Sequence, residues 1–163
     1  MSEKIHTGKQ IKKKIEKDGR KISWLAEKMQ CSISKISRIC QCENSNTDIL
    51  MPICLHLEHN FFNDYVEYVY KHIEKENDFL LYQFINSEIH IGKIIQKVKE
   101  DKGIKSNWIA KKIAYSPSNM QKIYTRKSIN TAVLVDISIY LKFNFFDIYV
   151  DYINEQMKKK KYT

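Results

Sequence analysis

Two short segments of the chain carry side chains that suit hydrogen bonding to a nucleic-acid duplex. A guanidinium group or a side-chain amide can bond twice to one base edge in the major groove, and a serine hydroxyl can bond to bases or phosphates. Residues 32–38 and 116–122 offer such groups at helical spacing. The candidates are Ser32, Ser34, Lys35, Ser37 and Arg38 in the first segment, and Ser116, Ser118, Asn119, Gln121 and Lys122 in the second. The simpler alternative for each segment is an ordinary solvated helix face.

Further polar residues around the second segment suit contacts with phosphate groups. Helix N-termini and loop cations both attract phosphate. The candidates are Lys105, Ser106, Asn107, Arg126 and Lys127. Residues 1–88 hold 13 basic and 13 acidic residues, whereas residues 89–163 hold 15 and 6, so the whole net charge of +9 lies in the second part. That part should bind a duplex more strongly.

The sequence lacks the motifs of an enzyme or of a cofactor site. It has no glycine-rich phosphate loop, no nucleophile elbow, no paired carboxylates and no HExxH pattern. Cys40, Cys42, His56 and His59 could supply two sulfurs and two nitrogens, but their spacing is not that of a zinc site. Small, partly buried hydrophobes are the simpler interpretation of the cysteines. We therefore expect no catalysis, no cofactor and no metal.

The composition predicts an all-α protein. Hydrophobic residues make up 43% of the chain and charged residues 29%, while four glycines and two prolines are few for the tight turns of an all-β fold. No apolar run approaches the roughly 20 residues of a membrane span, and the N-terminal residues lack the apolar core of a signal peptide. We expect a cytoplasmic protein with reduced cysteines, associated with the nucleoid if it binds DNA.

An internal repeat organises the chain. When residues 5–69 are aligned with residues 89–153 at a constant offset of 84, 26 of the 65 pairs are identical without a gap. The identical pairs include Gly8 with Gly92, Trp24 with Trp108, and Ala26 with Ala110. Because 65 residues suffice for a small helical domain, we interpret the repeat as a tandem duplication. The predicted divisions are a first domain at 1–70, a helical or packed linker at 71–88, a second domain at 89–157 and a disordered basic tail at 158–163.

Residues that start and stop helices predict five helices in each unit. Gly103 should end the first helix of the second copy in the left-handed conformation, Ser106 should cap the second, and Pro117 should lie in the first turn of the third. Asn130 and Thr131 should cap a fourth helix, and a fifth should follow from residue 145. The helices expected in the first copy are residues 8–18, 23–29, 34–40, 47–57 and 61 to about 74, with a possible extension to about 76.

The stretch WLAEKMQCSISKISRI at residues 24–39 resembles the helix-turn-helix core of the phage-repressor-like (XRE) family of DNA-binding regulators. The stretch WIAKKIAYSPSNMQKI at residues 108–123 is similar at the same places. In this pattern a small alanine, here Ala26 or Ala110, lets a short helix pack closely against the recognition helix. The resemblance covers both units. It implies two tandem five-helix helix-turn-helix (lambda-repressor-like) domains, each with a recognition helix that enters the major groove of double-stranded DNA. The chain departs from the family at residues 40–42 and 124–126, where a Glu-Asn-Gly-like turn is usual.

Aromatic and apolar residues near the ends of the units suggest a further contact. Phe79, Leu80, Leu81, Tyr82 and Phe84 are too apolar for a free linker and should pack on a unit or on a second chain. The predicted fifth helices repeat an aromatic set, at residues 61, 62, 65 and 68 and again at residues 145, 146, 149 and 152. We expect these rings to be core, with a homodimer through these helices or the linker as the alternative.

Two functions of different classes remain open. The first is a sequence-specific double-stranded DNA-binding transcriptional regulator that uses a recognition helix in each repeat, with the second repeat dominant. The alternative is a non-catalytic protein-interaction or antitoxin-like module that retains the helix-turn-helix fold without reading DNA. The first repeat has few bidentate readers besides Arg38, so it could read DNA or contact a protein. Neither a membrane nor a small-molecule substrate is expected as a partner.

Overall fold

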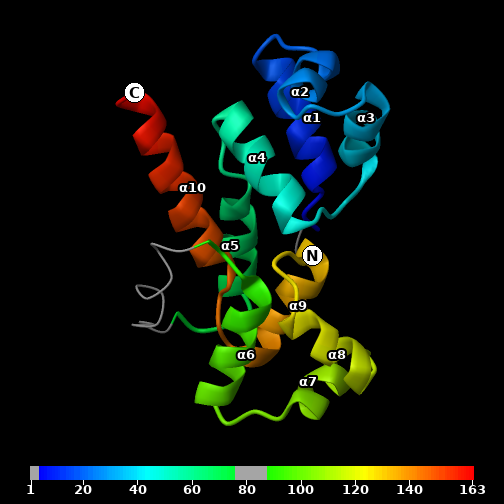
Figure 1. Ribbon diagram of the computed structural model, residues 1–163, viewed down its shortest axis with the longest axis vertical. Coiled ribbons are helices and arrows are strands. Elements are labelled where there is room, and N and C mark those ends of the chain that lie inside the picture. Colours follow the sequence, from blue (N-terminus) through cyan, green and yellow to red (C-terminus); the bar gives the residue numbers. More distant parts are fainter. Residues whose placement is uncertain (1–3, 76–87) are drawn as a thin grey trace.

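The structure is a computed structural model that describes residues 4–75 and 88–163. Over these ranges it consists of ten helices and contains no strand, so the prediction of an all-α protein is confirmed (Figure 1). The first five helices are α1 (Thr7–Lys17), α2 (Ile22–Lys28), α3 (Ile33–Gln41), α4 (Thr47–Leu57) and α5 (Phe62–Tyr70). The other five are α6 (Ile91–Asp101), α7 (Ser106–Lys112), α8 (Pro117–Tyr124), α9 (Thr131–Leu141) and α10 (Phe146–Lys161). Within the described ranges, none of them has the length and apolar character needed to cross a membrane.

The helices of the two halves begin at equivalent residues. Each of α6 to α10 starts 84 residues after its counterpart among α1 to α5. The left-handed backbone positions recur at the same offset: Gly19, Gln30 and Glu58 in the first half match Gly103, Ala114 and Lys142 in the second. Since the residue types differ at two of these three pairs, the packing of the helices must impose the local conformation.

Most of the predicted helix ends agree with the structure. Gly103 has φ +66° just after α6, the Ser116 hydroxyl caps α8, and the Asn130 side chain accepts a hydrogen bond from the Ala132 N–H at 2.9 Å. The prediction for Ser106 was wrong, because Lys105 occupies the N-cap position and Ser106 is the first helical residue. Its hydroxyl instead lies 2.8 Å from the Tyr124 hydroxyl.

Two other expected ends differ from the structure. α5 stops at Tyr70 and does not extend to residue 74; among the described residues 71–75 only Ile73 is partly buried, so a longer helix there would have little apolar surface to cover. The tail expected to be disordered is instead the last turn of α10, whose C-terminal half lies along α4, with the Lys160 Nζ 3.4 Å from the Leu55 carbonyl oxygen. The apolar linker residues at 79–84 lie outside the described residues.

Aromatic rings join the two halves of the chain. α5 packs against α10, and α10 also contacts α4. Phe62 stacks on Tyr149 with ring centroids 4.8 Å apart, and Tyr65 stacks on Phe146 at 4.7 Å. All four side chains are buried, so they are not available to a second chain. The two halves therefore share one continuous hydrophobic core, whereas the repeat in the sequence predicts two separate units.

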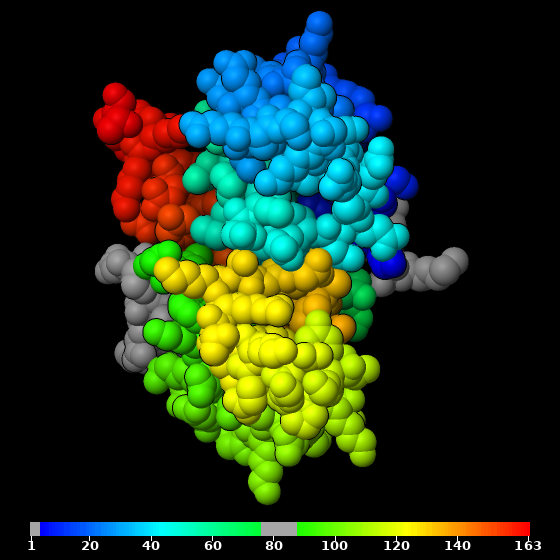
Figure 2. All heavy atoms as spheres, turned by 45° about the vertical axis from the view of Figure 1, so that its right-hand side comes forward, coloured from blue at the N-terminus to red at the C-terminus, as the bar shows by residue number. Residues whose placement is uncertain are grey.

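Hydrogen bonds extend this contact into the loops before α4 and α9, where Figure 2 shows the two halves meeting. The Thr47 N–H donates to the Ile129 carbonyl oxygen at 3.0 Å, and the Thr131 N–H donates to the Ser45 carbonyl oxygen at 2.9 Å. The buried Tyr65 hydroxyl donates to the Thr131 hydroxyl at 2.9 Å, and burial raises its pKa so that it stays protonated. These buried polar groups thus find their partners across the two halves.

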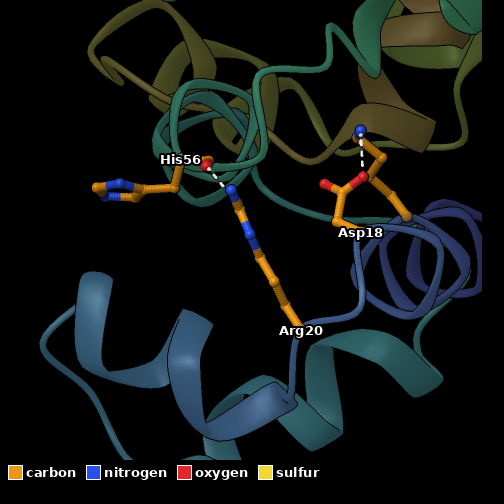
Figure 3. Close-up of polar contacts among 4 residues, drawn as sticks. Asp18, Arg20 and His56 are labelled. Carbon is orange, nitrogen blue, oxygen red and sulfur yellow. Dashed lines mark hydrogen bonds and ion pairs between the residues drawn. The ribbon is translucent and has the colours of Figure 1, made fainter.

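The two tryptophans occupy equivalent positions but have unlike cover. Arg20 places its guanidinium carbon 3.9 Å from the centre of the Trp24 ring and donates from Nη1 to the His56 carbonyl oxygen at 3.3 Å (Figure 3). Near Arg20, Asp18 accepts a hydrogen bond from the Lys14 ammonium group, which lowers the pKa of Asp18. The second copy has Ile104 in place of Arg20, and its Trp108 is 44% exposed. The environment of the indole ring therefore differs between the repeats.

The left-handed turn before α8 allows a simple stability test. Ala114 has φ +56°, a conformation in which the Cβ of an L-residue costs roughly 1–2 kcal/mol, partly offset in glycine by its greater freedom in the unfolded chain. We expect Ala114→Gly to raise the free energy of unfolding by about 0.5–1 kcal/mol in urea denaturation. Ala132→Gly, in the first turn of α9, should lower it by less than about 1 kcal/mol. A loss of stability in both variants would contradict the expectation.

Candidate nucleic-acid interface

α3 and α8 lie on the same face of the molecule. Figure 1 places both helices on the right, away from α10, and Figure 2 shows them on the face turned toward the reader, one above and one below the contact between the halves. Each follows a short helix, α2 or α7, through a left-handed residue, Gln30 or Ala114. The structure thus brings the two polar segments identified in the sequence onto one surface.

The outer sides of both helices are open to solvent. Of the ten candidate residues on these segments, Ser37 is half-buried and the others are exposed: Ser32, Ser34, Lys35, Arg38, Ser116, Ser118, Asn119, Gln121 and Lys122. Neither helix contains an acidic residue. The surface therefore presents hydroxyl, amide and cationic groups beside the exposed Ile33, with no carboxylate on either helix to repel a polyanion.

Two of the serines already form hydrogen bonds with the backbone of their own helices. The Ser32 hydroxyl accepts a hydrogen bond from the Lys35 N–H at 3.2 Å, and the Ser116 hydroxyl accepts one from the Asn119 N–H at 3.1 Å. Each thus serves as an N-cap. The Ser116 hydroxyl keeps its own proton for a phosphate, whereas the Ser32 hydroxyl also lies 3.1 Å from the Ser34 hydroxyl.

The inner sides of α3 and α8 pack against the core and fix the orientation of the two helices. Ile36 in the first copy, and Met120 and Ile123 in the second, are almost completely buried. Ala26 and Ala110, 2% and 1% exposed, lie where α2 contacts α3 and where α7 contacts α8. Their burial agrees with the expectation of a close helix crossing, which a larger side chain would widen.

Two glycines contact the C-terminal ends of these helices. They were not among the site residues predicted from the sequence. The Gly8 N–H donates to the Cys42 carbonyl oxygen and the Gly92 N–H to the Arg126 carbonyl oxygen, each at 3.0 Å. A Cβ built on Gly92 would come within 2.3 Å of the Ile123 carbonyl oxygen, and one on Gly8 would meet the end of α3 at 2.5 Å. The identity of the two glycines in the repeat was the signal that could have identified them.

The residues expected to contact phosphate lie around α7 and after α8. Lys105, Asn107, Arg126 and Lys127 are exposed, whereas Ser106 is half-buried. Lys127 forms an ion pair with the exposed Glu88 at 3.2 Å, a contact that solvent weakens. The basic residues at 158–161 lie on α10, away from the face that carries α3 and α8 (Figure 1).

The candidate metal ligands are not gathered into one site. All four cysteines are free, and the described ranges contain no group of three or more His, Cys, Asp or Glu side chains placed to hold a metal ion. Burial raises the pKa of Cys54 to about 12 and also raises the pKa of Cys40. These two thiols therefore remain protonated near neutral pH and pack as small apolar groups.

Comparisons with known proteins give no guide to the role of this surface. No protein-family model, no curated protein and no solved structure matches the chain. Any proposal about function therefore depends on the arrangement of the chain's own residues.

Proposed function

We propose that the protein is a sequence-specific double-stranded DNA-binding transcriptional regulator built from two tandem five-helix helix-turn-helix units of the lambda-repressor-like type, acting in the cytoplasm. The observation that carries the proposal is the shared face of α3 and α8, two equivalent short helices whose outer sides are mostly polar or basic, apart from the exposed Ile33 on α3, and lack carboxylates. An exposed helix of this kind fits the major groove, which is about 12 Å wide.

In this proposal the second repeat contributes more of the binding. At the position of Ser37 in α3, α8 has Gln121, whose amide can bond twice to adenine. After the helix, Arg126 and Lys127 replace Cys42 and Glu43 of the first repeat. The second repeat therefore has an amide and two cations where the first has a hydroxyl, a thiol and a carboxylate, whereas the first repeat has Arg38 at the position of Lys122.

The first test is a gel-shift titration of the full chain with a random-sequence duplex at low and moderate salt. Neutralised phosphates release counterions, so a DNA-binding protein should lose affinity steeply as salt rises. We expect a shift at low salt that weakens with the logarithm of the salt concentration. The absence of any shift at low salt would contradict the proposal.

Gln121→Ala and Arg126→Ala should separate the recognition of bases from the binding of phosphates. Gln121 lies exposed in the middle of α8, so its loss should weaken binding to a selected site by about 1–3 kcal/mol and leave binding to random DNA almost unchanged. Arg126 should contact phosphate, so its loss should weaken both alike and reduce the salt slope by about 1. Both constants can be measured by fluorescence anisotropy.

Lys161→Ala is the matched control, because it removes a cation from α10 on another side of the molecule. It should affect both kinds of duplex much less than Arg126→Ala does. If Gln121→Ala and Arg126→Ala bind the selected site as the unaltered chain does, then α8 is not the reading element.

A second candidate function is a non-catalytic protein-interaction or antitoxin-like module. It is favoured by the exposed pair of Trp108 and Tyr140, whose rings meet edge to face with centroids 6.3 Å apart. Exposed aromatic residues are enriched at protein contacts. A folded chain that fails to shift any duplex at low salt would make this candidate the better one.

A further inference from the structure

The contact between the halves follows a twofold rule. Several contacts between the halves recur in reverse when both residues are shifted by 84, although some, such as that of the Asn60 amide with the Asn154 side chain, do not. The Asn60 side-chain amide donates to the Val150 carbonyl oxygen at 3.1 Å, and the Asn144 amide donates to the Val66 carbonyl oxygen at 3.0 Å. The stacked ring pairs and the hydrogen bonds of Thr47 and Thr131 obey the same rule.

Two contacts join a residue to its own equivalent and so mark the axis. Asn46 pairs with Asn130 in an antiparallel bridge, and the Phe62 and Phe146 rings lie 6.4 Å apart. Such a self-complementary contact is the arrangement of a twofold dimer, here formed within one chain. α3 and α8, on either side of this contact, are therefore related by an approximate twofold rotation.

The two copies have mostly identical residues near the twofold axis, but several different residues on the outer sides of α3 and α8. With Ser45 and Ile129 as an exception, most residue pairs at the centre of the contact are identical between the copies: Asn46 with Asn130, Thr47 with Thr131, Asn60 with Asn144, Phe62 with Phe146, and Tyr65 with Tyr149. The outer sides of α3 and α8 differ, by contrast: the residues of α8 equivalent to Lys35, Ser37 and Arg38 are Asn119, Gln121 and Lys122. A homodimer presents two identical helices related by a twofold axis. This chain presents two different helices, α3 and α8, related by an approximate twofold axis.

We infer that one chain binds, as a monomer, a non-palindromic duplex site made of two unlike half-sites in inverted orientation. The inference depends on the proposed function. The twofold relation of α3 and α8 inverts one half-site relative to the other, and the different side chains make their sequences differ. Because both helices lie on one face, the half-site centres should be about 10 base pairs, or a multiple of that, apart.

The first experiment selects sites for the full chain from a pool of duplexes with 30 random base pairs. We expect enrichment of a site with two short elements of different sequence, bound by one chain per duplex in sedimentation. Enrichment of a palindrome, or two chains per site, would overturn the inference and leave the proposed function standing. Failure to enrich any sequence would overturn both.

A variant that makes the hydrogen-bonding groups of the two outer faces alike provides the sharper test. Asn119→Lys, Gln121→Ser and Lys122→Arg together give α8 the polar outer residues of α3, while Pro117 still differs from Ile33, and they leave the contact between the halves untouched. All three positions are exposed, so the fold should persist, which circular dichroism can verify.

This triple variant should prefer an inverted repeat of the α3 half-site over the site selected by the unaltered chain by about 10-fold or more. The unaltered chain should show the opposite preference. An unchanged preference in the folded variant would overturn the inference, because the two helices would then not read separate half-sites. Lys158→Ala with Lys159→Ala, on α10, serves as the control and should retain the original preference.

Discussion

Phe146→Ala is expected to lower the free energy of unfolding by about 3–5 kcal/mol. The side chain is completely buried, stacks on Tyr65 at 4.7 Å and lies 6.4 Å from Phe62, so its removal leaves a cavity between the halves that neither half can fill alone. Urea denaturation followed by circular dichroism measures the loss.

Tyr162→Ala is the control for this prediction. Tyr162 is an aromatic residue just after α10 and is 90% exposed, so its loss should change stability by less than about 0.5 kcal/mol. If Phe146→Ala cost as little as Tyr162→Ala, the halves would not share a core in solution.

Gly92→Ala is expected to lower the free energy of unfolding by about 1–3 kcal/mol, although alanine is the better helix former by about 1 kcal/mol. The new methyl group would lie 2.3 Å from the Ile123 carbonyl oxygen and 2.7 Å from the Tyr124 carbonyl group. Because these are backbone atoms, the end of α8 must move away from α6. Calorimetry measures the stability, and under the proposed function binding to a selected site should fall as well.

Lys93→Ala tests whether the effect of Gly92→Ala comes from the clash. Lys93 is the next residue of α6 and is exposed, so its substitution should change stability by less than about 0.5 kcal/mol. A gain in stability for Gly92→Ala would show that α8 can shift freely, which would contradict the close contact.

The sequence alone predicted the helices well because helix boundaries are set by local chemistry. Gly103, Pro117 and Asn130 act within one turn of their own position, so their effect is readable without knowledge of the fold. The failures occurred where distant residues decide. Ser106 bonds to Tyr124, 18 residues away, and the last turn of α10 lies beside Leu55, 105 residues before Lys160.

The candidate side chains on α3 and α8 were also predictable, because helical periodicity separates Ile36 and Met120 from their polar neighbours. The contact between the halves was not. Its polar members, such as Thr47 and Thr131, look like ordinary helix starts in the sequence, and their partners become evident only when the two copies are placed face to face. The repeat disclosed two similar units and left open that each unit completes the core of the other.

The different surroundings of the two tryptophans make them fluorescent reporters that a soluble quencher can distinguish. Trp24 lies beneath the Arg20 guanidinium, whereas Trp108 is 44% exposed, so a soluble quencher such as acrylamide should extinguish the emission of the second before that of the first. With a single tryptophan retained in turn, the fluorescence of each half can be followed separately during denaturation or ligand addition. The substitution of isoleucine for arginine between the repeats thus gives each half its own spectroscopic label, without any added dye.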